Sequence, residues 1–438
     1  MNKNIFWFRL FFALCAFIFS NFSHSLYRGS ESKTLSNGIE LICFETTRTD
    51  DVYIVLAIST GTNDSPKIPE ITELAGRIFA KNLRTKLNAD DSTYVTETSY
   101  HVGNDQTLFV MCGNRNNLSK YIEILDSCIA DFYFNESDLI QEKSQLIQIA
   151  NQQLKDDKAR LRAKAHLALY ARSCSQNFDA GRIDEITSDQ IKNFVNIYYL
   201  NDKKHLMVSC NTSRKNKNDI ENSLSKKFIF KKTDCSKQII KEQYLCYKTA
   251  KIVSVKSSQV KLPFVEIYWK APSYNDNFST SLHLDLFAKY LNHELNRSLA
   301  NKNLTSFVKI ENNHWNANSG EIKFAFIFKN PNESEIEKTI EIIVDEIRKI
   351  TDNSSSSNWL KSAIKELKQE TAVFNYKMEI IDTMIWTANR ISSGYKLDTL
   401  KNFHQSISET KKEDAELTAR EFFKKNPDVI SILKPVGE

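Results

Sequence analysis

The feature that most constrains the fold is an internal repeat with an offset of about 220 residues. The segment 186–210 contains a polar cap, an amphipathic helix that ends in paired tyrosines, an Asn-containing turn and an apolar strand. The segment 407–433 has the same order, with paired phenylalanines at the end of its helix. This offset is too long for a solenoid repeat and is typical of a duplicated domain.

The openings of the two halves follow the same scheme. In the first half, 34–45 has a turn at Asn37-Gly38 and then alternating apolar residues, and 52–60 is a second strand-like run. The second half opens with strand-like runs at 250–255 and 264–272. In each half a helical stretch, another strand and a long amphipathic stretch follow. We therefore predict an α+β fold of two homologous domains, each a mixed or antiparallel sheet packed with helices.

The predicted boundaries follow from composition. Residues 1–25 read as a signal peptide, because positive charge precedes an apolar run of about ten residues that is short for a membrane span. An uncleaved membrane anchor is the alternative. We assign 26–212 to the first domain, 213–245 to a Lys- and Asn-rich linker, and 246–438 to the second domain. We expect an exported protein, in the periplasm of a Gram-negative bacterium, with no membrane contact beyond the export signal.

Charge and cysteine content exclude several classes of protein. The net charge of +5 is small beside 59 basic and 54 acidic residues, so we expect no nucleic-acid partner. The absence of C-x-x-C argues against a zinc ribbon or a thioredoxin-type site. Seven cysteines follow the signal segment, an odd number, and Cys43, Cys112 and Cys210 lie in strand-like runs. We favour buried free thiols for them over disulfides.

Four ordered segments carry a resemblance to a known family. They are SNGIELICFE, TSDQIKNFVNIYYLNDKKHLMVSC, YLNHELNRSLANKNLTSF and SSGYKLDTLKNFHQSIS. Together they resemble the insulinase/pitrilysin family of zinc peptidases, which includes mitochondrial processing peptidase subunits and their bacterial relatives. The resemblance implies a clamshell of two similar domains facing each other across a cavity.

The residues that carry the chemistry of this family are missing from the matching positions. Active members bind zinc through H-x-x-E-H on a helix, and the glutamate acts as general base. A second glutamate ligand follows the pair that Glu142-Lys143 matches, and an Arg and a Tyr of the second domain contact substrate. By this resemblance the degenerate positions here are Gly76, Phe79, Ala80, Ile149, Ala300 and Phe307.

Peptide binding can outlast the loss of these residues. In the family an edge strand of the first domain takes up substrate as an added strand, which requires only main-chain pairing. The matching strand here is formed by Tyr94, Val95, Thr96, Glu97 and Thr98, although an ordinary strand is an equal reading. We expect no cofactor.

The resemblance implies a non-catalytic homologue that binds peptides or serves as the inactive partner of an active zinc peptidase subunit, in a heterodimer or as a homodimer. One alternative is an active zinc metalloendopeptidase with an atypical site, which would require zinc. The other is a structural or binding protein with no peptidase partner.

Overall fold

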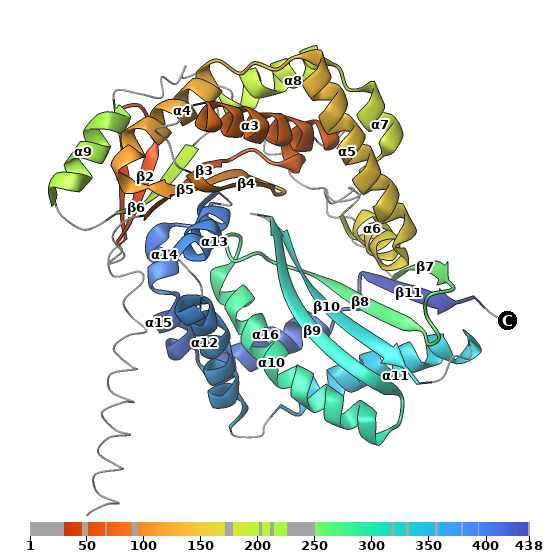
Figure 1. Cartoon of the computed structure of the whole chain (residues 1–438). Helices are drawn as coiled ribbons and strands as arrows, with labels where there is room; N and C mark the ends of the chain where they lie inside the picture. The colour runs from red at the N-terminus through yellow and green to blue at the C-terminus, as the bar shows by residue number, and fades with distance from the viewer. Residues whose placement is uncertain are drawn as a thin grey trace, which may run out of the picture.

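The computed structural model describes residues 30–45, 51–65, 68–89, 95–170, 178–200, 204–210, 214–225, 250–316, 319–329, 333–354, 358–377, 380–392 and 394–436. They form two β-sheets surrounded by helices, so the predicted α+β class is confirmed (Figure 1). The predicted signal segment, 1–25, lies outside these residues. Within them, no helix combines the length and the apolar character that a membrane crossing needs.

The first sheet has six strands in the order β1-β2-β6-β3-β5-β4. Their bounds are β1 Glu31–Thr34, β2 Glu40–Glu45, β3 Asp51–Ile58, β4 Val95–Val102, β5 Thr107–Asn114 and β6 Lys204–Cys210. Only β2 and β6 pair in parallel, and the other neighbours are antiparallel. Strand β4 therefore lies at one edge of the sheet.

The second sheet repeats this topology with five strands in the order β7-β11-β8-β10-β9. Their bounds are β7 Lys251–Ser257, β8 Phe264–Ala271, β9 Thr305–Asn316, β10 Ser319–Phe328 and β11 Val429–Pro435. The one parallel pair, β7 with β11, corresponds to β2 with β6. The repeat read from the sequence thus has a structural counterpart, with β9 in the edge position that β4 occupies in the first sheet.

Local sequence signals explain several of these elements. Gly38 adopts a φ of 85°, and the turn is closed by a hydrogen bond of 2.8 Å from Leu35 N–H to Ile39 O, as expected for Asn-Gly between two strands. Thr187 caps helix α8, with Gln190 completing a capping box. The helix ends in a π-helical turn at Val195–Tyr199, which places Tyr199 in the core.

The helices of the first half are α3 Glu70–Asn88, α4 Leu118–Ala130, α5 Glu136–Lys155, α6 Asp157–Tyr170, α7 Ala180–Glu185, α8 Ser188–Phe194 and α9 Arg214–Ser225, with short 3₁₀ turns at Thr62–Asp64 and Arg115–Asn117. All of these helices except α6 cover one face of the first sheet. Leu56, Phe109 and Val208 of the sheet pack with Ile78 and Leu125 of these helices in one core. Because alternate strand residues point to opposite faces, this core uses only one side of the sheet.

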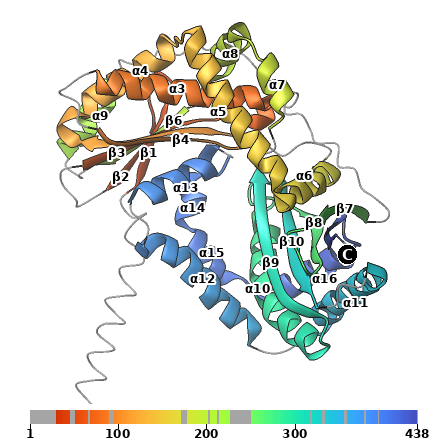
Figure 2. The same ribbon diagram turned by 45° about the vertical axis from the view of Figure 1, so that its right-hand side comes forward.

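The other face of the first sheet is covered by a helix of the second half. The helices of the second half are α10 Phe278–Asn301, α11 Glu333–Asp352, α12 Trp359–Lys377, α13 Ile380–Ser392, α14 Leu397–Lys401, α15 Phe403–Glu409 and α16 Lys412–Phe423. Met384 and Ala388 of α13 belong to the same apolar cluster as Val55 and Met207 of the first sheet. Both views show α13 beneath the first sheet (Figures 1 and 2).

Helix α6 makes the reciprocal contact. It belongs to the first half, but its Leu161, Leu169 and Tyr170 pack against strands β7, β8 and β11 of the second sheet. The Tyr170 hydroxyl donates to Gly320 O over 2.8 Å. Helices α10, α11 and α16 cover the opposite face, so each sheet has one face covered from within its half and one from the other half.

The segment predicted to be a linker, 213–245, begins with a helix that belongs to the first core. Ile220 and Leu224 of α9 are buried there, and Leu224 O accepts a hydrogen bond from the Asn37 side chain. The prediction missed this helix because the two apolar residues stand among many Lys and Asn residues. The part from 226 to 245 lies outside the described residues.

Cys43, Cys112 and Cys128 are buried and form no disulfide, as expected for the first two. The side chain of Cys210 lies outside the described part.

Candidate functional site: the α3–β4 edge

Helix α3 crosses the edge strand β4 at very short range. A Cβ atom added to Gly76 would lie 2.8 Å from Val102 Cγ2 and 3.5 Å from Tyr100 Cδ2, both on β4. Contacts between a Cβ and another carbon below about 3.4 Å are repulsive. A histidine at position 76 therefore could not be accommodated unless Val102 moved.

The other two positions predicted on α3 are filled by core packing. Phe79 has no exposed surface, and its ring centroid lies 4.1 Å from that of Phe109. Tyr199 packs edge-on against the same ring, 6.1 Å away. Ala80 is also buried. An aromatic cluster thus occupies the position at which the resemblance expects a general base.

A charged cluster lies directly beside these positions. Arg77 Nε donates to Glu73 Oε1 over 3.2 Å, and Arg77 Nη1 lies 3.3 Å from Glu142 Oε2 on α5. Gln145 Oε1 accepts from the same Nη1 over 3.3 Å. The Tyr100 hydroxyl of β4 donates to Glu73 Oε1 over 3.0 Å. Arg77 therefore links α3 to α5 and, through Glu73, to the edge strand.

Burial changes the acidity of two groups in this cluster. Burial raises the pKa of the Glu73 carboxyl, although the charge of Arg77 and hydrogen bonds from Tyr100 and Arg77 act in the opposite direction. Burial, together with the nearby Glu73 charge, raises the pKa of Tyr100 as well. Tyr100 therefore stays a hydrogen-bond donor at neutral pH.

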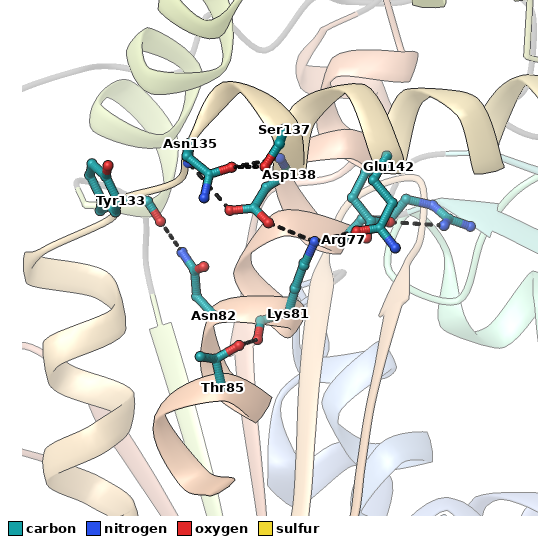
Figure 3. Close-up of polar contacts among 10 residues, drawn as sticks. Arg77, Lys81, Asn82, Thr85, Tyr133, Asn135, Ser137, Asp138 and Glu142 are labelled. Carbon is teal, nitrogen blue, oxygen red and sulfur yellow. Dashed lines mark hydrogen bonds and ion pairs between the residues drawn. The ribbon is translucent and has the colours of Figure 1, made fainter. Parts of the chain in front are cut away.

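Two further side chains of α3 attach this helix to α5 and to the turn that precedes α5. Lys81 Nζ lies 2.7 Å from Asp138 Oδ1 and donates to Gln141 Oε1 at the same distance. Asn82 donates to Tyr133 O. Figure 3 shows this side of α3, with Arg77, Lys81 and Asn82 directed toward α5 and its N-terminal turn. Polar contacts therefore join α3 to α5 along this side.

The remaining degenerate positions lie elsewhere. Ile149 is half-buried on α5, two helical turns after Glu142, and its apolar side chain cannot ligate a metal. Ala300 is exposed at the C-terminal end of α10, and Phe307 at the start of β9 is 42% exposed. The connection from α10 to β9 lies at the corner of the second half that is remote from α3 in both views (Figures 1 and 2).

The two edge strands differ in how their outer main-chain groups are satisfied. On β9, Ile310 N–H donates to Asn292 Oδ1 over 3.2 Å, and Asn296 Nδ2 donates to Val308 O over 3.1 Å. Both asparagines belong to α10, which therefore closes this edge. On β4, no side chain among the described residues binds the main chain in this way.

The free groups of β4 can be assigned from the hairpin that follows it. Gly103 N–H donates to Gln106 O over 2.8 Å, so residue 103 faces β5. Antiparallel pairing alternates, and the register from Thr98 to Val102 is regular. The main-chain groups of Thr98, Tyr100 and Val102 therefore point away from the sheet.

The predicted edge residues are described only in part. The side chain of Glu97 is exposed and that of Thr98 is half-buried. The side chains of Val95 and Thr96, and all of Tyr94, lie outside the described part.

Comparison with protein families gives one match, over residues 185–367, to the family described as "Peptidase M16 inactive domain". The chain is a homologue of the M16 peptidases. This agrees with the resemblance read from the sequence, since M16 is the insulinase family. None of the curated proteins has a matching sequence.

Solved structures show how widely the fold of this M16 homologue is shared. A protease from Helicobacter pylori superposes with a TM-score of 0.73 at 18% identity, over 93% of this chain and 99% of that one. A peptidase M16 inactive domain from Pseudomonas fluorescens gives 0.75 at 13%, over 93% and 98%. The first half of the periplasmic protease PqqL from Escherichia coli gives 0.75 at 12%, over 94% and 92%. At these identities the likeness establishes the fold alone.

The zinc ion that the family implies does not fit the residues of this M16 homologue. Gly76 and Ala80 offer no ligand, Phe79 offers no base, and the space beside Gly76 is occupied by Val102. In the described part of the chain, no group of three or more His, Cys, Asp and Glu side chains could hold a metal ion.

The sequence reading did not find the cluster around Arg77. Glu73 and Arg77 are four residues apart, a spacing that favours an ion pair on a helix, and that signal was available. Their contacts with Tyr100 and Glu142 join residues 27 and 65 positions apart, which no local pattern predicts.

Proposed function

We propose that this M16 homologue is a non-catalytic protein that binds extended peptides along the outer edge of β4. One observation carries the proposal: β4 presents the main-chain groups of Thr98, Tyr100 and Val102 next to α3, where Gly76, Phe79 and Ala80 offer no peptidase chemistry. Added strands derive affinity from main-chain hydrogen bonds, so such binding needs no catalytic side chain. The inactive-domain description of the matched family supports the same reading.

The proposal includes an arrangement and a place in the cell. The two halves would be homologous domains, 26–212 and 246–438, closing on each other as a clamshell with β4 on the inner side. The repeated strand order supports this. Export to the periplasm would follow from a signal at 1–25, and the fold neighbour PqqL is a periplasmic protease, which is in keeping with it.

A substitution of Thr98 tests edge binding. Thr98→Pro removes an outward N–H and leaves the β4–β5 ladder intact, because Pro is tolerated on the free side of an edge strand. Thr98→Val is the matched control, since it also loses the hydroxyl that accepts from Arg84 Nε but keeps the N–H. The probe is an acetylated, amidated peptide of alternating threonine and valine, followed by fluorescence anisotropy with a labelled copy.

We expect Thr98→Pro to weaken binding of this probe by roughly tenfold, as for one lost hydrogen bond, and Thr98→Val to leave it nearly unchanged. Amide hydrogen exchange should slow over 95–102 when the peptide binds and stay unchanged over 305–316. Equal binding by the proline variant would refute the proposal. Stoichiometric zinc with chelator-sensitive cleavage of the probe would establish the active alternative instead.

A second candidate role is that of an inactive subunit beside an active zinc peptidase, for which the inactive-domain description is the supporting observation. Purification of the tagged chain from its native cell tests this role. A stable complex with an H-x-x-E-H homologue is the expected result. A homodimer or an isolated chain would contradict it, and an isolated chain would favour a binding protein without a peptidase partner.

A further inference from the structure

Arg77 has donor capacity that its contacts within the chain do not use. Its Nε and Nη1 atoms are bound to Glu73, Glu142 and Gln145, but among the described residues Nη2 has no hydrogen-bond partner. The side chain is 13% exposed, so solvent reaches part of it. The guanidinium is therefore held in place by two carboxylates while one of its nitrogens remains available.

The position of this guanidinium is fixed relative to the β4 edge. Glu73 Oε1 accepts both from Arg77 Nε at 3.2 Å and from the Tyr100 hydroxyl at 3.0 Å. Tyr100 is the middle of the three residues whose main-chain groups point outward. A strand added to β4 would lie roughly 4.8 Å beyond it, next to the outward main-chain groups of Tyr100, the residue that Glu73 ties to Arg77.

Charge decides what kind of acceptor the free nitrogen would meet. The single positive charge of Arg77 faces the carboxylates of Glu73 and Glu142, and both lie within hydrogen-bonding distance of it. The cluster is therefore not electropositive, and it has no excess charge with which to attract an anion. A neutral carbonyl oxygen is the acceptor that suits it, because a carbonyl accepts from a guanidinium without adding negative charge.

We infer that Arg77 anchors a bound peptide by donating a hydrogen bond from Nη2 to a main-chain carbonyl of the strand added at β4. The inference rests on the proposed function and assigns its first side-chain contact. It implies a preference for uncharged extended peptides over peptides that place a carboxylate at this point. Arg77 would thus act as a binding residue in a position where the family resemblance implies none.

The test compares Arg77→Lys with the wild-type protein, using the same capped threonine–valine peptide. Lysine keeps the charge between Glu73 and Glu142 but lacks the planar fork that supports three internal hydrogen bonds and one outward hydrogen bond together. We expect the affinity to fall by about tenfold, as for the loss of one hydrogen bond. Arg160→Lys makes the same exchange on α6, where Arg160 pairs with Asp157, and should change nothing.

A chemical change in the peptide separates a direct contact from a structural effect. In a series of peptides, each amide carbonyl in turn is replaced by a methylene group. At one position the replacement should weaken binding to the wild-type protein but have little further effect on Arg77→Lys, since the two changes remove the same bond. A merely structural role for Arg77 predicts additive losses at every position, which would overturn the inference.

The outcomes distinguish this inference from the proposal beneath it. If Thr98→Pro weakens peptide binding and Arg77→Lys does not, edge binding stands and the Arg77 contact is refuted. If the wild-type protein does not bind the peptide, both fail. Tighter binding of the same peptide with a free C-terminal carboxylate would refute the preference for a neutral acceptor.

Discussion

The close approach of α3 to β4 makes a sharp prediction about Gly76. In an exposed helix, Gly→Ala stabilises by about 1 kcal/mol, because alanine loses less conformational freedom on folding. At Gly76 the new methyl group would lie 2.8 Å from Val102 Cγ2. Overpacking of this kind typically costs about 1–3 kcal/mol, and the β-branched Val102 has few rotamers into which it can move.

The two effects have opposite signs, and their difference sets the expected result. We expect Gly76→Ala to lower the free energy of unfolding by about 0–2 kcal/mol in the wild-type background. In a Val102→Ala background the obstructing methyl group is gone, so the same change should raise stability by about 1 kcal/mol. The sign of the Gly76→Ala effect therefore reverses between the two backgrounds.

The cycle is measured by urea unfolding, monitored by circular dichroism, of the wild-type protein, Gly76→Ala, Val102→Ala and the double variant. The coupling between the two sites should be about 1–3 kcal/mol. If Gly76→Ala is stabilising by the same amount in both backgrounds, Val102 yields freely and the steric argument against a histidine at this position fails.

Three further predictions concern the core, the second edge and pH. Phe79→Ala should lower the free energy of unfolding by about 3–5 kcal/mol in urea titrations, because Phe79 is fully buried against Phe109. Phe307→Ala should change this free energy little, because Phe307 is 42% exposed. Similar losses at both sites would contradict the packing described. Asn292→Ala combined with Asn296→Ala should uncover the β9 edge and produce concentration-dependent self-association in light scattering. Asn353→Ala is the control and should leave the protein as it was, because Asn353 follows α11 directly and its side chain donates to Lys349 O of that helix. An unchanged particle size of the double variant would refute the capping role. Because the pKa of Glu73 is raised in the folded state, this group's contribution to stability is fully present below its ordinary pKa of 4.5 and is lost as pH rises through the folded-state pKa. In chemical denaturation measured as a function of pH, Glu73→Gln should lack this decline. If the variant and the wild-type protein lose stability in parallel over the same pH range, Glu73 is not its cause.

Much of the fold could be predicted because its signals are local. The Asn37-Gly38 turn, the Thr187 cap and the matching ends of the two halves depend on neighbouring residues, and each has its structural counterpart. The edge position of β4 was predicted through the family resemblance, and the sheet order agrees with it. The absence of metal ligands at Gly76, Phe79 and Ala80 could be predicted by matching these positions to the family motif.

The unpredicted features all depend on long-range packing. An amphipathic pattern shows that a helix has an apolar face but not which sheet that face covers. Periodicity therefore could not predict that α6 packs on the second sheet and α13 on the first. Helix α9 has a weak apolar signal because, among its described side chains, Ile220 and Leu224 are the ones that enter the core. The cap on β9 depends on two asparagines of α10, a residue type with no periodic signal.

The exchange of helices between the halves has a consequence for how the chain is made. Until Met384 and Ala388 of α13 have been synthesised, the face of the first sheet that bears Val55 and Met207 lacks the helix that covers it. Helix α6, by contrast, emerges well before the strands β7 and β11 against which it packs. An uncovered apolar sheet face of this kind is prone to aggregation. Neither half can therefore complete its folding while the other is missing, and the chain reaches its native state only after nearly all of its 438 residues are available.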